Sequence, residues 1–229
     1  ILEATGAMGG QMVNLYTNEG GVSPKKYIKD LEAKMRADKN ITVHLNTKVE
    51  DVAGFVGNFK VKVTGGKELE TGAIVVATGA KPYEPKEYNY GKNKAVVTQN
   101  ELEKTLVEGK FNAKTVVMIQ CVGSRNDEAP YCSRVCCSKA VKNAIEIKKK
   151  DPKAQVYILH KDIRTYGFRE TLYKEAGELG VKFIRFPENK MPEMTSDGKI
   201  MVDDTVLGAP VQLSPDMLVL SVGIRPNDD

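Results

Sequence analysis

The spacing of hydrophobic positions changes several times along the first half of this chain, and each spacing predicts a different element. Apolar residues at helical intervals follow Ser23 and Pro24, which predicts a helix with Ser23 as its N-cap. A strand is expected over 41–45, and the alternation over 49–63 predicts a β meander. The continuous apolar run over 73–77 is typical of a strand buried on both faces.

The second half alternates short apolar runs with amphipathic stretches. A short helix is expected over 101–108, and a β excursion over 200–213. Between and after them the pattern predicts further strands at 115–120, 156–160, 181–186 and 217–223 and further helices at 135–150 and 168–179. Strands that alternate with helices in this way indicate a parallel sheet with right-handed crossovers, so the predicted fold class is α/β.

Composition and charge exclude several classes of protein. At 229 residues, with 41% hydrophobic and 28% charged residues, the chain has the composition of an ordinary soluble globular protein of one large or two modest domains. The net charge of +4 is spread along the sequence, which gives no basis for nucleic-acid binding. No apolar stretch approaches the ~18–20 residues of a membrane span and no signal peptide is visible, so we expect a cytoplasmic protein.

The four cysteines are the strongest chemical signal in the sequence. Cys121, Cys132, Cys136 and Cys137 fall within seventeen residues, in the spacing C-x10-C-x3-C-C. Four thiolates are the usual ligand set of one iron–sulfur cluster. Cys121 ends a predicted strand and Cys136 and Cys137 begin a predicted helix, where a dinucleotide-binding fold normally has its glycine-rich phosphate loop.

Other roles for these cysteines are zinc binding, disulfide formation and simple packing. Tetrahedral zinc brings its sulfurs to within roughly 4 Å of one another, which is awkward for the neighbours Cys136 and Cys137 on one helix. Disulfides are seldom needed in a large cytosolic domain, and packing explains one or two clustered cysteines better than four. We therefore expect a [4Fe-4S] cluster, with the helix N-terminus lowering the pKa of both neighbouring thiols.

Three further signals, each weak alone, suggest a nucleotide cofactor. Glu3 at a strand end is followed by Gly9, Gly10 and Gln11, and an acidic residue at such a position can bind a ribose. The apolar run over 73–77 ends in Thr78 and Gly79, which permits a close approach of backbone to cofactor. The apolar run over 217–222 also ends in glycine. Each of these can also be an ordinary glycine turn.

The order of these signals resembles the flavoproteins with two dinucleotide-binding domains that are related to thioredoxin reductase. More specifically, segments 117–125, 131–137 and 162–167 are similar to the family of A-type subunits of heterodisulfide reductase. This resemblance implies a partial FAD-type domain over 1–111 and 212–229 and an inserted Rossmann-like domain over 112–211. It also implies that the N-terminal loop for the FAD diphosphate is missing. We therefore expect this chain to be part of a longer protein and to be inactive by itself.

The resemblance further implies cofactors, partners and site residues. FAD would be approached by Glu3, Gly9, Gly10, Gln11, Val49, Thr78 and Gly79, and the [4Fe-4S] cluster would be held by Cys121, Cys132, Cys136 and Cys137. The implied partners are other heterodisulfide reductase-like subunits and electron carriers such as ferredoxin.

The function expected from these features is electron transfer between FAD, the cluster and partner subunits. No catalytic side chain is predicted, because no general acid, nucleophile or substrate pocket is recognisable. One alternative is a pyridine-nucleotide disulfide oxidoreductase that uses a cysteine pair, although no G-x-G-x-x-G follows the strand over 115–120. The other is a non-enzymatic assembly module that zinc stabilises. His160, which ends a predicted strand, is expected to be a structural residue at the edge of the core.

Overall fold

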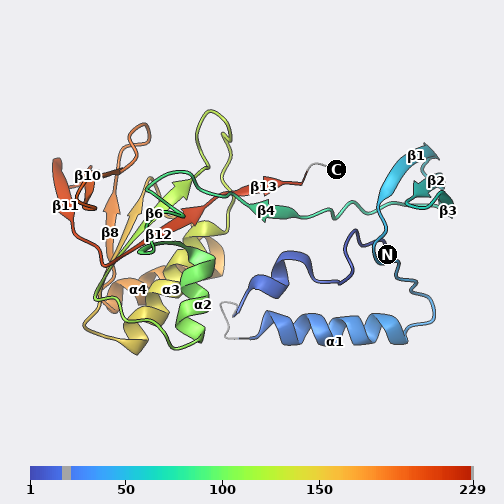
Figure 1. The fold of residues 1–229 in the computed structure, drawn as a ribbon, viewed down its shortest axis with the longest axis horizontal. Helices are drawn as coiled ribbons and strands as arrows, with labels where there is room; N and C mark the ends of the chain where they lie inside the picture. The colour runs from blue at the N-terminus through green and yellow to red at the C-terminus, as the bar shows by residue number, and fades with distance from the viewer. Residues whose placement is uncertain (17–21, 228–229) are drawn as a thin grey trace. The chain divides into compact units, whose positions relative to one another are not determined.

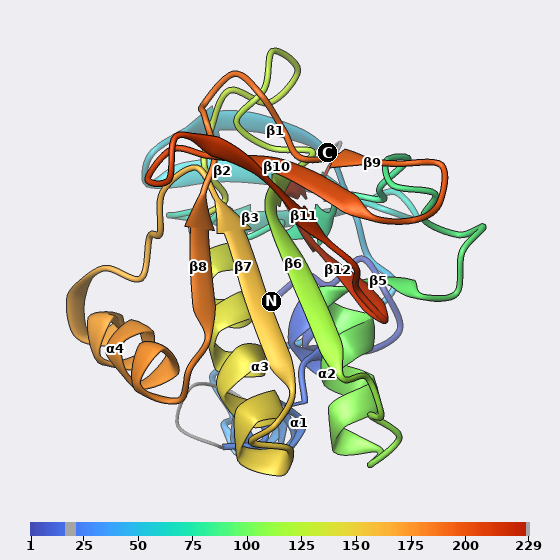
Figure 2. The same ribbon diagram turned by 90° about the vertical axis from the view of Figure 1, so that its left-hand side faces the viewer.

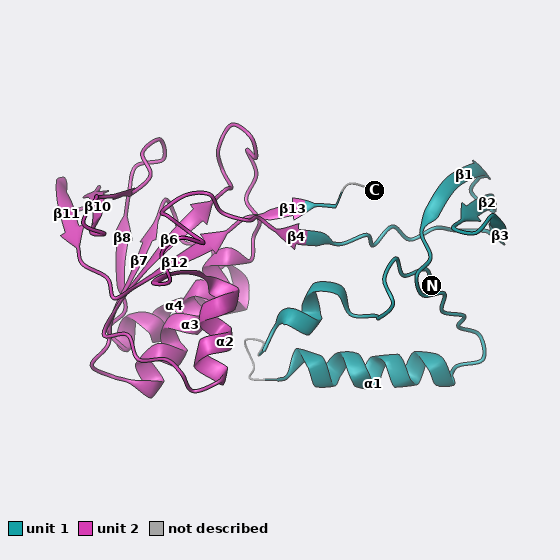
Figure 3. Ribbon diagram, viewed as in Figure 1, with its two compact units in different colours: residues 1–80, 226–229 teal, residues 81–225 magenta. Residues whose placement is uncertain are grey.

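The computed structural model describes residues 1–16 and 22–227, which form two compact units (Figure 3). Unit 1 comprises Ile1–Ala80 and Pro226–Asp229, and unit 2 comprises Lys81–Arg225. These boundaries differ from the expected ones at 111/112 and 211/212. The difference arises because the segment after residue 81 and the strand near residue 217 both contribute to the main sheet of unit 2.

Unit 1 contains one long helix whose start follows the predicted pattern. Helix α1 (Pro24–Ala37) has Ser23 as its N-cap, and the Ser23 side chain accepts a hydrogen bond from the backbone N–H of Lys26. Pro24 suits the first turn because its missing N–H would have no partner there. A short 3₁₀ helix, η1 (Gly10–Asn14), precedes α1 in the chain.

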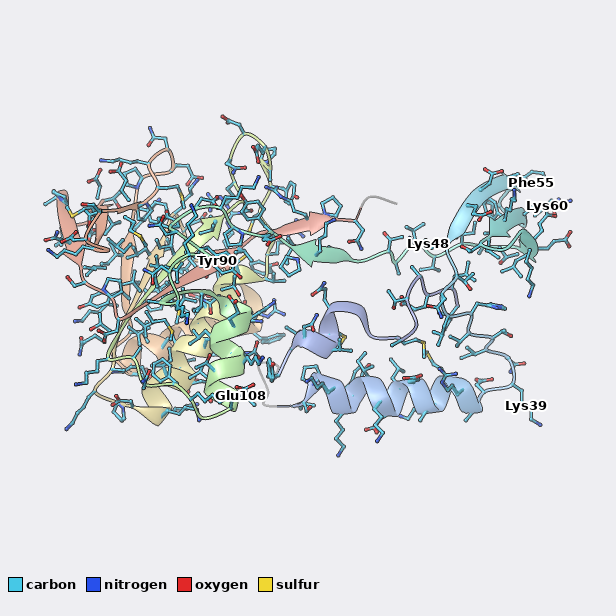
Figure 4. All side chains as sticks on the ribbon, viewed as in Figure 1. Lys39, Lys48, Phe55, Lys60, Tyr90 and Glu108 are labelled. Carbon is cyan, nitrogen blue, oxygen red and sulfur yellow. The ribbon has the colours of Figure 1, made fainter. Side chains whose placement is uncertain are left out.

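The predicted β meander of unit 1 is confirmed. Strands β1 (Val49–Phe55), β2 (Asn58–Val63) and β3 (Lys67–Thr71) form an antiparallel sheet in that order. Phe55 and Lys60, labelled in Figure 4, lie on this meander, and Phe55 at the end of β1 is 68% exposed.

Two predicted strands of unit 1 are absent from the described residues. The segment over 41–45 makes only a single bridge, between Leu2 and His44. The run over 73–77 has no regular structure, and Val75 is 91% exposed where we expected a fully buried strand. An apolar run becomes a strand only when neighbouring strands accept and donate its backbone hydrogen bonds, and the described part of unit 1 supplies none here.

Unit 2 is built on a parallel sheet, which confirms the predicted fold class (Figures 1 and 2). Its five strands lie in the order β5-β12-β6-β7-β8, and every neighbouring pair is parallel. The strands are β5 (Val96–Thr98), β6 (Thr115–Val122), β7 (Gln155–His160), β8 (Lys182–Arg185) and β12 (Met217–Val222).

Helices cover one face of this sheet and a small second sheet covers the other, as Figure 2 shows. The helices are α2 (Gln99–Val107), α3 (Cys136–Lys150) and α4 (Glu170–Glu178), the last of which follows η2 (Gly167–Arg169). The second sheet contains β9 (Glu193–Met194), β10 (Ile200–Asp204) and β11 (Ala209–Leu213). The short strands β4 (Ala80–Pro82) and β13 (Ile224–Pro226) pair separately.

The alternation of side chains along the central strands divides the core into two parts. Val116 and Met118 of β6 pack with the helices, whereas Val117 and Ile119 pack with residues of β10 and β11. All four are fully buried. A strand covered on both faces is apolar at every position, which explains why β6 is a continuous apolar run in the sequence.

No helix in the described ranges is both long enough and apolar enough to cross a membrane.

Candidate metal centre

The candidate site lies where β6, β7 and β12 end. Because parallel strands place their carboxyl ends at the same edge of a sheet, the segments that follow these three strands meet there. The register of β6 against β12 shifts between Leu220 and Val222, so Gln120 and Cys121 of β6 lie opposite Ser221 alone. Such a β-bulge turns a side chain out of the regular alternation of the strand.

Cys121 occupies this bulge with an unusual backbone conformation. Its φ is 64°, in the left-handed region that residues other than glycine rarely adopt. The ladder of β6 and β12 continues to the pair Val122–Val222, which holds the bulge on its far side. The strain at Cys121 directs its thiol to the edge of the sheet, and strain of this kind is concentrated at functional sites.

The connection from β6 to α3 carries Cys132 and is anchored by hydrogen bonds. Ser124 Oγ donates to the carbonyl oxygen of Tyr131 at 2.7 Å, and the Tyr131 hydroxyl donates to the carbonyl oxygen of Ile224 at 3.1 Å. The backbone N–H of Ile224 donates in turn to Ser133 Oγ at 2.8 Å. These contacts fix the connection against the segment that follows β12.

Backbone groups around the cavity contact three of the four sulfurs. The N–H of Arg134 lies 3.3 Å from Cys132 Sγ, an arrangement that would stabilise a thiolate. The Cys136 thiol donates to the carbonyl oxygen of Val222 at 3.3 Å, and Cys137 Sγ lies 3.9 Å from the carbonyl oxygen of Asp162.

The structure brings all four cysteines to one cavity, and all four are free thiols. Six other residues line the cavity with them, namely Ser124, Arg125, Ser133, Arg134, Asp162 and Arg164. Within the described residues, no group of three or more His, Cys, Asp and Glu side chains has the geometry to hold one metal ion. Four thiols from one strand–turn–helix segment around a single cavity have the donor chemistry that an iron–sulfur cluster requires.

The expected lowering of the thiol pKa values is wrong. Burial raises the pKa of Cys136 to about 12 and that of Cys137 to about 11. Neighbouring thiols raise the pKa of Cys136 further, because a second negative charge nearby is unfavourable. The increase in thiol pKa that burial causes is therefore larger than any decrease caused by the helix N-terminus. These thiols would need a positively charged metal nearby to become thiolates at neutral pH.

Two of the arginines that line the cavity, Arg125 and Arg164, share one carboxylate, that of Asp162, and none of these three was predicted as a site residue. Arg125 pairs with Asp162 and Glu188, and Arg164 Nη2 pairs with Asp162 at 3.0 Å. Burial alone would raise the pKa of Asp162, but hydrogen bonds from Arg164 and Arg125 outweigh it and lower that pKa. Their position in the sequence, directly after the strands β6 and β7, could have predicted this role, because binding sites in open parallel sheets lie at the carboxyl ends of the strands.

His160 does not line the cavity. It is 8% exposed at the end of β7, and its ring packs edge-on against Phe183 with the centroids 6.2 Å apart. The structure therefore agrees with the expectation of a structural histidine.

The residues expected to approach FAD lie at four places in unit 1. Glu3 accepts hydrogen bonds at 2.8 Å from the backbone N–H and the hydroxyl of Thr5. Gly9 and Gly10 have positive φ at the start of η1, and Gln11 follows them exposed to solvent. Val49 begins β1 and is 50% exposed.

Thr78 and Gly79 form the fourth place. The carbonyl oxygen of Thr78 accepts a hydrogen bond of 2.7 Å from the Asn227 side chain, and Gly79 has a φ of 77°. A β-carbon at Gly10 would meet nothing within 4 Å and one at Gly79 would meet only the Asn227 amide at 3.9 Å, so both glycines leave their backbone open to a ligand.

No protein-family model matches the chain, but curated proteins do. It is 38% identical over 181 residues to the A-type subunit of the H(2):CoB-CoM heterodisulfide,ferredoxin reductase of Methanothermobacter thermautotrophicus, a match that covers 69% of this chain and 27% of that protein. It is 39% identical over 184 residues to the A-type iron-sulfur subunit of the CoB--CoM heterodisulfide reductase of Methanocaldococcus jannaschii, covering 71% and 28%. The matches therefore span little more than a quarter of these relatives.

Solved structures share the fold at low sequence identity. Thioredoxin reductase from T. acidophilum matches 98% of this chain and 68% of its own, with 15% identity and a TM-score of 0.53. Bacillithiol disulfide reductase from Staphylococcus aureus matches 99% and 69%, with 12% identity and a TM-score of 0.53. The predicted similarity is thus confirmed in both sequence and fold: over about 70% of its length, this chain is homologous to part of the A-type subunits of heterodisulfide reductase.

Proposed function

We propose that this chain is the part of an electron-transferring oxidoreductase subunit that holds a [4Fe-4S] cluster on Cys121, Cys132, Cys136 and Cys137. The observation that carries the proposal is the convergence of all four cysteines of the chain on one cavity. A cluster bound there would accept and release single electrons. The relative from Methanocaldococcus jannaschii, named an iron-sulfur subunit, supports this choice of group.

The residues of this chain position the sulfurs and limit access to them. The bulge at Cys121 and the first turn of α3 bring thiols from two elements to one cavity. Cys137 is 7% exposed and the other three cysteines are partly buried, so the sulfurs are only partly open to water. Partial burial protects a cluster from solvent while it leaves a side through which electrons can pass.

We further propose that FAD binds to the longer proteins in which these elements occur. Glu3, Gly9, Gly10, Gln11, Val49, Thr78 and Gly79 are the residues we propose to approach it, with electron carriers and other subunits of the complex as partners. The two disulfide-reductase structures that match the chain support this assignment at the level of fold alone.

Metal and sulfide analysis of anaerobically purified protein tests the proposal. We expect about four irons and four acid-labile sulfides per chain and a brown colour. Stoichiometric zinc without sulfide would instead favour the zinc-stabilised assembly module.

Titration with NADH tests the other alternative. The end of β6 and the turn after it have Cys121, Gly123 and Arg125 in place of a three-glycine phosphate loop, so we expect no micromolar binding of NADH to unit 2. Tight NADH binding, together with a redox-active cysteine pair and no iron, would favour the pyridine-nucleotide disulfide oxidoreductase.

A further inference from the structure

We propose that Arg125 and Arg164 raise the reduction potential of the group held by the four cysteines, and that Asp162 positions both arginines for this role. The inference rests on the proposed function, because it concerns the cluster proposed for this cavity. Both residues line the cavity together with the cysteines. They come from different strands, Arg125 following β6 and Arg164 following β7.

The carboxylate of Asp162 links the two arginines. It accepts from Arg164 Nε at 3.1 Å and from Arg164 Nη2 at 3.0 Å, and its Oδ1 also accepts from Arg125 Nη1. A planar guanidinium that makes two hydrogen bonds to one carboxylate has a fixed orientation. Asp162 therefore holds both charges at the cavity wall, where an unanchored arginine would extend into solvent.

Arg125 is the more buried of the two arginines and is held at further points. Its side chain is 11% exposed, and its second terminal nitrogen pairs with Glu188. Its backbone carbonyl oxygen accepts a hydrogen bond of 3.0 Å from Lys161 Nζ, which fixes the backbone of Arg125 as well as its side chain. Burial reduces the screening of these charges by solvent, so their effect on a neighbouring group is larger than at the surface.

Both arginines share the cavity lining with all four cysteines. Arg125 follows Cys121 by four residues, just past the end of β6, and Arg164 comes from the segment that follows the neighbouring strand β7. The two positive charges thus belong to residues that surround the same cavity as the proposed ligands.

The direction of the effect follows from charge. Reduction adds one electron to the cluster and no proton, so the cluster with its four thiolates becomes more negative by one charge. Nearby positive charges stabilise the reduced form more than the oxidised form. Arg125 and Arg164 therefore make the cluster easier to reduce, whichever electron donor supplies the electron.

The test is a spectroelectrochemical titration of the iron-loaded chain and its variants. We expect R125Q and R164Q, made singly, each to lower the equilibrium constant for reduction about tenfold, which for a one-electron couple is about 59 mV. R125K and R164K keep the charge, so we expect potentials close to that of the wild-type protein. Lys149→Gln is the matched control, because Lys149 lies 55% exposed at the far end of α3 from the cysteines.

Three results would overturn the inference. Unchanged potentials in fully iron-loaded R125Q and R164Q would refute it while leaving the proposed cluster in place. If the lysine variants lowered the reduction potential as much as the glutamine variants do, the arginines would act by packing and not by charge. Wild-type protein without iron would refute the proposed function and this inference with it. If R125Q does not retain iron, R164Q decides, because Arg164 is 39% exposed and its loss leaves a smaller defect.

Discussion

Gly123 and Tyr83 are in such close contact that a β-carbon on Gly123 would lie 2.1 Å from Cδ1 of the Tyr83 ring. The contact is fixed from both sides, because Gly123 follows the bulge of β6 and the N–H of Tyr83 donates to the carbonyl oxygen of Gly223 at 2.8 Å. Gly123 also has a φ of 65°. Only glycine at position 123 therefore allows both the left-handed backbone conformation after the bulge and the close contact with the Tyr83 ring.

We predict that Gly123→Ala lowers the free energy of unfolding by about 3 kcal/mol, as the sum of a left-handed alanine and an overpacked contact. Urea denaturation measures the change. Gly180→Ala is the control, because Gly180 has a φ of 84° and no neighbour within 4 Å of an added β-carbon. Gly180→Ala should lower the free energy of unfolding by only about 1 kcal/mol. Equal losses in the two variants would contradict the role of the Tyr83 ring.

Each cysteine of α3 should be needed for the cluster. We predict that Cys136→Ser and Cys137→Ser, made singly, lose bound iron and its visible absorption while the far-ultraviolet circular dichroism stays unchanged. The sheet core does not depend on the metal, because β6 and β12 are buried by apolar residues on both faces. Ser138→Ala is the matched control, since Ser138 follows Cys137 on the helix without lining the cavity.

A Cys137→Ser variant with a complete and unaltered cluster would remove Cys137 from the ligand set. A different fourth ligand would then have to be found, and Asp162, which lines the cavity with the cysteines, would be the first residue to replace.

Glu103 fixes α3 on α2 and thereby the position of Cys136 and Cys137. Its side chain is 3% exposed, with Lys139 Nζ at 2.8 Å and Lys142 Nζ at 2.5 Å from its carboxylate oxygens. We predict that Glu103→Gln lowers the free energy of unfolding by about 3 kcal/mol, because it removes the negative charge between two poorly solvated lysines.

Glu178→Gln provides the comparison for Glu103. Glu178 pairs with Lys174 at 3.9 Å and is 67% exposed, so its replacement should change stability by less than about 0.5 kcal/mol. Thermal or urea unfolding of both variants measures the difference. Similar small effects at the two positions would show that the buried ion pairs contribute no more than exposed ones.

His160 should make stability depend on pH. Burial, with a contribution from Arg185, lowers the pKa of His160 to about 4 in the folded protein. Below about pH 6.5 the unfolded chain binds a proton that the folded chain does not, so the stability present above pH 6.5 falls as the pH drops toward 4. The loss attributable to this group is on the order of 3 kcal/mol.

Comparison with His160→Gln isolates this effect. The variant should show a smaller fall in the free energy of unfolding between pH 6.5 and pH 4 than the wild-type protein does. Identical slopes in the two proteins would assign the pH dependence to other groups.

The local pattern of the sequence determined most elements of unit 2 and some of unit 1. Continuous apolar runs identified β6, β7 and β12, because strands covered on both faces must be apolar throughout. Ser23 and Pro24 identified the start of α1, because a cap acts through bonds within a few residues. The cysteine spacing likewise predicted a shared site, since the end of a strand and the start of the next helix always lie near one another.

Tertiary structure alone decided the features that depend on distant partners. The apolar run over 73–77 did not form a strand, because nothing in the described part of unit 1 pairs with it, and the spacing of its residues carries no information about pairing. The thiol pKa values of Cys136 and Cys137 rose because burial at the sheet edge outweighed the helix terminus. Arg125 and Arg164 reach one carboxylate, Asp162, only because β6 and β7 are neighbours in the sheet, a pairing that sequence spacing does not encode.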